Sequence, residues 1–339
     1  MESYAFLNDM LRSAVNDGCF PWAVAAVGRR DRVLARAMAG GADLQTRFDM
    51  ASVTKIIAPT MLALLAIERG SLTLYDRVSR FFDAPADKAD ITILELMTHT
   101  AGFEPHFFLS NEADDPDDAA RAILRHPLAA ARDGAPRYSC MGFILLGKIL
   151  EKIYNTPLDE AARTHVFEPL GMLHTGYCPS GRNIAQTEVD SVTGTALCGV
   201  VHDENARFLG GVSGNAGVFS DIDDMILFAS MLAQEGGGFL SPATLRKAIR
   251  NYTPGYDVHR GLGFHLAGTP ENFMGDLFPE SSFGHTGFTG PSVAVDPETG
   301  LYAILLTNRV HPTRENDKHL RFRRCFHNRV YAAVNRGRI

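Results

Sequence analysis

The chain has 339 residues, of which 45% are hydrophobic and 21% are charged, so it can bury a large core as one large domain or two smaller ones. Its formal net charge of −6 argues against general nucleic-acid binding, and its apolar runs are interrupted before the length of about 20 residues that spans a bilayer. The first residues, Met1-Glu-Ser-Tyr, carry an acid where a signal peptide carries basic charge, which predicts a cytoplasmic location.

The first part of the chain predicts a helix, a hairpin and a second helix. Apolar residues recur at helical spacing over residues 2–17. Apolar runs at 22–27 and 33–38 flank a short polar turn and predict a β-hairpin. Residues 53–69 form a long apolar helical stretch. Pro59 lies inside it and has no N–H to donate, so we expect a kink or a loosened first turn there.

The middle of the chain is predicted to be mostly helical, and the C-terminal part returns to strands. Helical patterns cover residues 91–97, 139–154 and 221–235. Strands separated by short turns follow at 282–286, 292–296 and 301–307, before a closing helix. The two early and three late strands predict an α/β protein of the α+β type with one five-stranded antiparallel sheet. We expect the terminal helices on one face of this sheet and the central helices on the other.

Ser52 and Lys55 are the first candidates for chemistry. They lie three residues apart at the start of the apolar helix, and residues at this spacing share one helical face. A hydroxyl held beside an amine can act as a nucleophile next to a base. The helix N-terminus adds unpaired amides, which are the groups that stabilise an oxyanion. A four-residue match is weak by itself, because a capping serine followed by a surface lysine has the same spacing.

Two later segments add further candidates. Tyr138 precedes the helix at 139–154, and near a lysine its phenol could serve as a second base, although a tyrosine in this place usually serves packing. The segment His285-Thr-Gly287 ends a predicted strand at a glycine, where a ligand can approach the backbone closely. Taken alone, His285 is more simply a strand histidine with satisfied hydrogen bonds.

Other kinds of site find no support in the sequence. It contains no Gly-x-Ser-x-Gly elbow, no His-Glu-x-x-His and no Cys-x-x-Cys, so we predict no α/β-hydrolase triad, no metal site and no cofactor. Residues 142–149 nearly match a phosphate-binding loop, but the last position is isoleucine. A basic cluster near the end is interpreted as a solvated helix face; it consists of Arg321, Arg323, Arg324 and Arg329.

Taken together and in this order, the motifs resemble those of serine β-lactamases and penicillin-binding proteins, on the side of class C β-lactamases and family VIII esterases. The resemblance covers nearly the whole chain, in the segments 48–55, 96–102, 138–139, 167–172, 214–220 and 285–287. It implies a discontinuous sheet-containing domain at 1–75 and 205–339, a mostly helical domain at 76–204, and an active site between them.

The resemblance also implies a role for each motif residue. Ser52 is the nucleophile that accepts the acyl group, and Lys55 and Tyr138 act together as general base and then general acid. The backbone amides of Ser52 and Phe288 form the oxyanion hole. The residues that contribute to substrate binding are Cys140, His285, Thr286 and Gly287.

Two positions depart from the family pattern. Where β-lactamases and D,D-peptidases have Tyr-x-Asn, this chain has Cys140, which is a poor hydrogen-bonding substitute for an amide. Where those enzymes usually have Lys-Thr-Gly, it has His285, whose imidazole is largely neutral at neutral pH. The loss of one fixed positive charge and one amide weakens the recognition of a β-lactam or peptide carboxylate.

The sequence therefore favours a serine hydrolase of the carboxylesterase type that acts on small esters or amides. One alternative keeps the chemistry but changes the substrate, as in a β-lactamase, a D,D-carboxypeptidase or a D-amino-acid peptidase. A second alternative is a non-catalytic binding protein, in which Cys140 and His285 mark a decayed site. We expect residues 103–135 and 178–215 to shape the pocket. The candidates for an apolar wall are Phe103, His106, Phe107 and Phe108.

Overall fold

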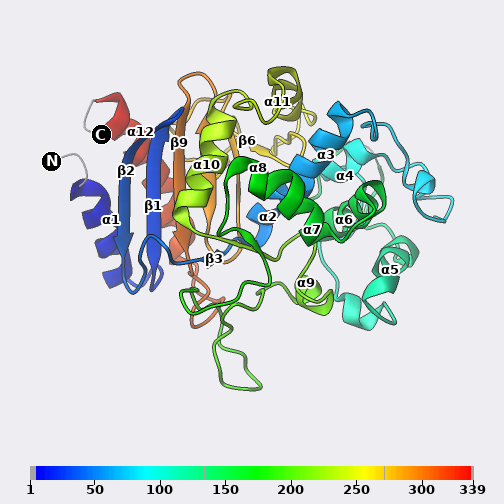
Figure 1. Cartoon of the computed structure of the whole chain (residues 1–339), viewed down its shortest axis with the longest axis horizontal. Helices are drawn as coiled ribbons and strands as arrows, with labels where there is room; N and C mark the ends of the chain where they lie inside the picture. Colours follow the sequence, from blue (N-terminus) through cyan, green and yellow to red (C-terminus); the bar gives the residue numbers. More distant parts are fainter. Residues whose placement is uncertain (1–4, 133, 271, 337–339) are drawn as a thin grey trace.

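The computed structural model describes residues 5–132, 134–270 and 272–336 and has an antiparallel sheet of six strands at its centre (Figure 1). The strands lie in the order β2-β1-β9-β8-β7-β6. Their bounds are β1 Ala23–Arg29, β2 Arg32–Ala39, β6 His265–Leu266, β7 Phe283–Thr286, β8 Ser292–Asp296 and β9 Leu301–Thr307. The early hairpin and the three late strands are confirmed. The predicted number of five strands is one too few, because the two-residue β6 is too short to show a strand pattern.

Helices cover both faces of this sheet, as predicted (Figure 1). Helices α1 (Ala5–Asn16) and α12 (Lys318–Asn335) pack on one face, and α10 (Ile222–Ala233) packs on the other. The alternation of side chains along β1 explains the two layers, because Ala25 belongs to the core under the terminal helices and Val24 to the core under α10.

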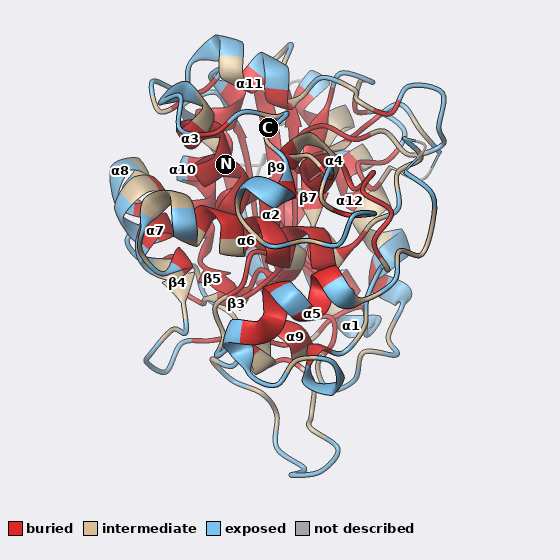
Figure 2. Ribbon diagram, turned by 90° about the vertical axis from the view of Figure 1, so that its right-hand side faces the viewer, coloured by how far each residue is buried: buried red, intermediate tan, exposed pale blue. Residues whose placement is uncertain are grey.

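A largely helical region lies to the right of the sheet in Figure 1. Its helices are α4 Ile93–Thr98, α5 Ala119–Arg125, α6 Cys140–Tyr154, α7 Leu158–Ala162, α8 Glu168–Leu170 and α9 Glu204–Phe208. Helix α11 (Pro242–Ala248) contacts α3 (Pro59–Glu68). Helix α6, most of whose residues are buried, lies near the centre of Figure 2. One hydrophobic core runs from α6 through α10 to the sheet. The division into a discontinuous sheet domain and a helical domain stays a prediction.

The segment that carries Ser52 and Lys55 joins the sheet side to the helical region. It begins in a small sheet of three strands and continues as a 3-10 turn and two helices: β3 Phe48–Asp49 beside β5 Val218–Ser220 and β4 Gly176–Tyr177, then Ala51–Val53, α2 Thr54–Ile57 and α3 Pro59–Glu68. The predicted break is confirmed, because Ala58 leaves helical geometry with φ −119° and ψ −81° directly before Pro59.

The same segment passes a test of length and hydropathy for a membrane span. Within the described residues, Ala51–Glu68 is the one helical stretch that is long and apolar enough, and 83% of it is buried inside the fold. It therefore serves as a core element that carries the candidate nucleophile at its first turn.

Candidate active site

Ser52 lies in the 3-10 turn between β3 and α2. The residue before it, Ala51, has a φ of +43°, a left-handed conformation that costs energy for any residue with a side chain. The buried Asp49 carboxylate accepts the N–H of Ala51 at 2.8 Å and the N–H of His202 at 2.7 Å. Burial raises the pKa of Asp49, and these two donors oppose the rise. Asp49 therefore positions the nucleophile turn, and the sequence analysis missed this residue.

Lys55 is fully buried and reaches the predicted nucleophile. Its Nζ donates to Ser52 Oγ at 2.9 Å and to the carbonyl oxygen of Asn215 at 2.9 Å, and it lies 3.7 Å from Cys140 Sγ. The same nitrogen lies 5.0 Å from the centre of the Tyr138 ring. Burial works against the ammonium, but the ionisable Cys140 and Tyr138 beside it outweigh burial and raise the pKa of Lys55. At neutral pH Lys55 is therefore a charged donor to Ser52.

Tyr138 and Cys140 are held in place by the loop that follows α4. His99 ends α4 in a left-handed conformation, with φ 59°, and its Nδ1 accepts the N–H of Ser139 at 3.1 Å. Ser139 caps α6, and its Oγ donates to the carbonyl of Glu104 at 2.6 Å. The rings of His99 and Tyr138 lie 4.5 Å apart. The loop after α4 thus fixes the position of both candidates at the start of α6.

Strand β7 brings the third motif alongside the nucleophile turn. A Cβ added at Gly287 would lie 2.6 Å from the carbonyl oxygen of Met50, so glycine is needed for this close approach. Thr289 Oγ1 donates to the carbonyl of Asp49 at 2.7 Å and ties the following loop to the same turn. Phe288, between them, leaves 48% of its surface exposed.

His285 is buried and neutral. Its Nδ1 lies 2.7 Å from the carbonyl oxygen of Thr286, so Nδ1 carries the proton, and Nε2 has no hydrogen-bond partner among the described residues. Burial, with a smaller contribution from the Lys55 charge, lowers the pKa of His285 well below its ordinary value. Its ring lies 4.4 Å from that of His265 and 6.2 Å from that of Tyr138. This burial agrees with the expectation of an uncharged imidazole at this position, which stays a prediction.

The candidate residues share one cavity of about 560 Å³. Those that line it are Ser52, Tyr138, Cys140, His285, Thr286, Gly287 and Phe288, and Lys55 reaches it through Ser52 Oγ. The two segments expected to shape the pocket do so, through His106 and Phe108 from the first and His202, Asp203 and Glu204 from the second. The other two candidates for an apolar wall serve packing: Phe103 is buried in the core, and Phe107 stacks at 4.0 Å on the ring of His126.

The cavity also contains residues that the sequence analysis missed. They are Arg260, His265, Arg309, Arg314 and, from α12, Arg323. The interpretation of the C-terminal basic cluster as a solvated helix face is wrong for Arg323, whose Nε is buried. An amphipathic pattern shows which residues are polar, but it cannot show whether the polar stripe faces water or a cavity. Arg260 lies shortly before β6 and His265 is its first residue, in a stretch of sequence without any recognisable motif.

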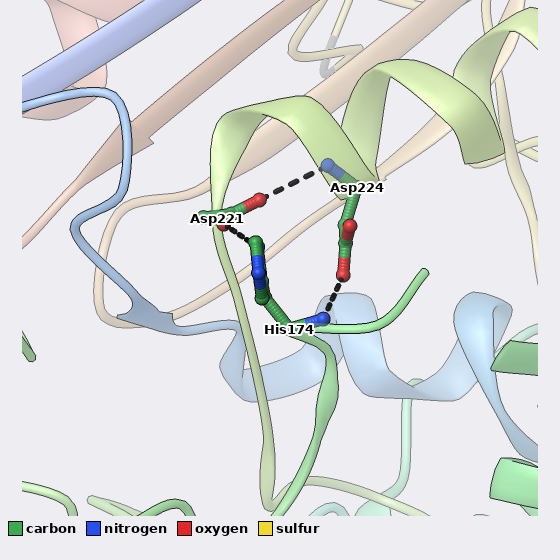
Figure 3. A group of neighbouring side chains, drawn as sticks. All are labelled: His174, Asp221 and Asp224. Carbon is green, nitrogen blue, oxygen red and sulfur yellow. Dashed lines mark hydrogen bonds and ion pairs between the residues drawn. The ribbon is translucent and has the colours of Figure 1, made fainter. Parts of the chain in front are cut away.

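A second group of polar side chains has the composition of a metal site but belongs to a helix cap. The ligand atoms of His174, Asp221 and Asp224 lie within 4.8 Å of one another (Figure 3). Asp221 accepts the N–H of Asp224 at 3.0 Å and lies 2.7 Å from Nδ1 of His174, while Asp224 accepts the N–H of His174 at 2.7 Å and the hydroxyl of Thr175 at 2.7 Å. These bonds fix the start of α10, so we assign this group no ligand.

Comparison with known protein families agrees with this geometry. The model of the family described as Beta-lactamase matches residues 7–327. A putative D-alanyl-D-alanine carboxypeptidase of Salmonella typhi is 30% identical over 315 residues, which cover 82% of this chain and 72% of that protein.

Solved structures show the same fold at lower identity. EstCE1, described as a hydrolase with promiscuous acyltransferase activity, has a TM-score of 0.80 at 23% identity and covers 97% of this chain and 98% of its own. The penicillin-binding protein of Bacillus halodurans has a TM-score of 0.71 at 18% identity and covers 96% of this chain and 98% of its own. The family match and the sequence relatives place the chain in the beta-lactamase family of serine hydrolases.

Proposed function

We propose that this protein hydrolyses small esters or amides through an acyl-enzyme on Ser52. The observation that carries the proposal is the 2.9 Å contact between Nζ of the buried Lys55 and Oγ of Ser52, which lines a cavity of about 560 Å³. A hydroxyl in contact with a buried ammonium is stabilised as it loses its proton, which is the requirement for a serine nucleophile.

The charge on Lys55 assigns the proton transfers. We assign the Ser52 proton to the oxygen of Tyr138, with the Lys55 ammonium as counter-charge. Ser52 Oγ then bonds to the substrate carbonyl carbon, and the backbone amides of Ser52 and Phe288 stabilise the oxyanion. Tyr138 gives the proton to the leaving oxygen or nitrogen as its bond to carbon breaks. Water repeats the sequence on the ester of Ser52 and releases the acid.

The choice of esters or amides over β-lactams rests on Cys140. Its Sγ lies 3.7 Å from Lys55 Nζ, at the motif position where the family's β-lactamases have an amide. A thiol is a weak donor and acceptor, so it cannot hold a substrate amide as asparagine does. The histidine at position 285 does not leave the cavity without positive charge, because arginines line it. The lost lysine at this position is therefore no reason to exclude a substrate with a carboxylate.

A D-alanyl-D-alanine carboxypeptidase is the second candidate function, favoured by the relatives that are 30% identical and carry that putative name. A screen of p-nitrophenyl acetate and butyrate, a D-alanyl-D-alanine peptide and penicillin, with the Ser52→Ala variant as blank, separates the two. We expect ester turnover that requires Ser52. Preferential release of D-alanine would select the second candidate. A folded protein that turns over none of these compounds and is not labelled by a fluorophosphonate probe would instead be a binding protein.

A further inference from the structure

The lining of the cavity has a positive charge that the chain as a whole does not share. The chain has a formal net charge of −6. The lining contains four arginines, Arg260, Arg309, Arg314 and Arg323, and two acids, Asp203 and Glu204, so it has an excess of two positive charges. A cleft lined by one sign of charge concentrates ligands of the opposite sign.

Two of these arginines already have partners within the protein. Arg314 forms ion pairs with Glu188 at 2.6 Å and with Glu204 at 2.7 Å. Arg309 donates to the backbone carbonyls of Phe288 at 2.7 Å and of Asn316 at 2.7 Å. These contacts give both side chains a structural role in the loops around the cavity.

The other two arginines, Arg260 and Arg323, keep buried nitrogen atoms that have no partner among the described residues. In the part of the chain that the structure describes, neither forms an ion pair with a carboxylate. Arg260 is 6% exposed, and its Nε and Nη1 are buried without a hydrogen-bond partner. The Nε of Arg323 is buried and unpartnered in the same way. A buried guanidinium nitrogen without a partner destabilises a fold, so two neighbouring arginines that both carry such nitrogens call for an external anion.

Both guanidinium groups lie at one end of the cavity, around the two histidines. Arg323 Cζ lies 5.9 Å from the centre of the Phe273 ring. That ring lies 6.1 Å from the ring of His265, which lies 4.4 Å from the ring of His285. The Cζ of Arg260 lies 5.3 Å from the centre of the Tyr138 ring. Burial lowers the pKa of each arginine to about 10, so both stay charged at neutral pH, while burial keeps both imidazoles uncharged.

We propose that Arg260 and Arg323 bind a dianionic group of the substrate, either a phosphate monoester or a pair of carboxylates. Guanidinium groups match both chemistries, because their planar N–H donors bind oxyanions in pairs. A ligand with two negative charges balances the excess of two positive charges in the cavity lining. A ligand with a single carboxylate leaves one of these positive charges uncompensated. The site lies against Tyr138, the group that protonates the leaving atom, so the dianion belongs to the leaving group.

Apolar side chains complete the site on its exposed side. Phe108, Phe288 and Leu320 line the cavity and leave 48%, 48% and 49% of their surfaces exposed. They suit an apolar part of the substrate, while the charged part lies inward at the arginines. This assignment of a substrate class rests on the proposed hydrolysis through Ser52.

The first test compares acetate esters that differ only in the charge of the leaving phenol: phenyl acetate, meta-carboxyphenyl acetate, the acetate of hydroxyisophthalate, and meta-acetoxyphenyl phosphate. We expect kcat/KM for at least one of the two dianions to exceed that for phenyl acetate by about tenfold or more, with the monoanion between. Comparison of the isophthalate with the phosphate ester separates the two anion chemistries. Equal kcat/KM values across the set, with Ser52-dependent turnover retained, would overturn the dianion site and leave the hydrolase standing.

Variants tie the preference to the two side chains. Arg260→Gln and Arg323→Gln should each lower the ratio of dianionic to neutral kcat/KM by about fivefold or more. Arg246→Gln is the matched control, because Arg246 lies on the exposed side of α11 and pairs with Glu235 at 3.0 Å. A ratio that both cavity variants leave unchanged contradicts the assignment.

A binding measurement keeps the test independent of catalysis and of the stability of the arginine variants. The Ser52→Ala protein is titrated calorimetrically with isophthalate, phenyl phosphate, benzoate and isophthalamide. We expect at least one of the two dianions to bind about tenfold more tightly than benzoate, and isophthalamide to bind most weakly. Dianions that bind no better than benzoate would overturn the proposal even if every ester is hydrolysed.

Discussion

The two ends of the cavity differ in how completely their polar groups are paired. At one end, Lys55 Nζ contacts Ser52 Oγ, the carbonyl of Asn215 and Cys140 Sγ, so its donors are used within the protein. At the other end, two buried nitrogen atoms of Arg260 have no partner among the residues that the structure describes. Groups that perform the chemistry have to be held in place before the substrate arrives, whereas groups that select the substrate keep their donors free for it.

The substitution of Ser52 by alanine changes only the end of the cavity at which Lys55 contacts Ser52. Because the proposed mechanism passes through an acyl group on Ser52 Oγ, we expect kcat on p-nitrophenyl butyrate to fall by at least about a thousandfold. Binding of a dianion at Arg260 and Arg323 should survive, which calorimetry measures on the same protein. Ser13→Ala on the exposed side of α1 is the matched control. Undiminished turnover in the Ser52 variant would remove the assignment of the nucleophile.

The Gly287→Ala substitution displaces the strand that joins the two ends. The new Cβ would lie 2.6 Å from the carbonyl of Met50, so β7 or the nucleophile turn has to move by a fraction of an ångström. A displacement of this size at the reacting atoms lowers kcat/KM by about a hundredfold. Gly176→Ala is the control, since a Cβ there meets nothing within 4 Å. Wild-type kinetics in Gly287→Ala would show that this contact is not needed.

The difference between the two ends also explains how much could be read from the sequence. Ser52 and Lys55 are three residues apart, and His285, Thr286 and Gly287 are consecutive, so local spacing and resemblance were enough to predict that they meet. The sheet was predicted except for β6, which is held by pairing with β7 and has no pattern of its own.

The end of the cavity that contains Arg260 and Arg323 could not be predicted from the sequence, for a physical reason. Arg260 precedes β6 and Arg323 lies on α12, and only the folding of the sheet edge against the last helix brings them to one cavity. A sequence pattern shows that Arg323 is on a polar stripe, but burial of that stripe depends on what packs beside it. Asp49 was missed because its role is to accept two backbone N–H groups, which no side-chain motif records.

The guanidinium of Arg314 differs from those of Arg260 and Arg323 because it is paired with a carboxylate, that of Glu188, at 2.6 Å. Burial works against this carboxylate, but the bonds from Arg314 and His202 hold the pKa of Glu188 at about 2. A folded-state pKa below the unfolded one stabilises the protein at neutral pH, and this stability is lost as the pH falls from about 4 to about 2. We expect Glu188→Gln to lower the free energy of unfolding at neutral pH by on the order of 1 kcal/mol, discounted for partial exposure.

Denaturant unfolding of wild type and Glu188→Gln across this pH range measures the effect. The difference between the two proteins should shrink as the pH approaches 2, because the wild-type carboxylate is then protonated as well. Glu315→Gln, at an exposed position of the neighbouring loop, is the control. A difference that stays constant with pH would mean that the glutamine acts through packing and not through charge.

Cys140→Asn changes one group beside Lys55 and leaves the arginine end as it is. An asparagine at this position restores an amide that can hold the amide of a penicillin or a peptide, and one hydrogen bond of this kind changes a rate by about fivefold. We expect acylation of Ser52 by penicillin, followed by intact mass, to become faster by that factor, while the ratio between dianionic and neutral esters stays the same. The substitution separates the two determinants, because the residue beside the lysine selects the bond that is cleaved and the two arginines select the charge that the leaving group carries. An equal gain on penicillin and on every ester would show instead that Cys140 limits the chemistry common to all of them.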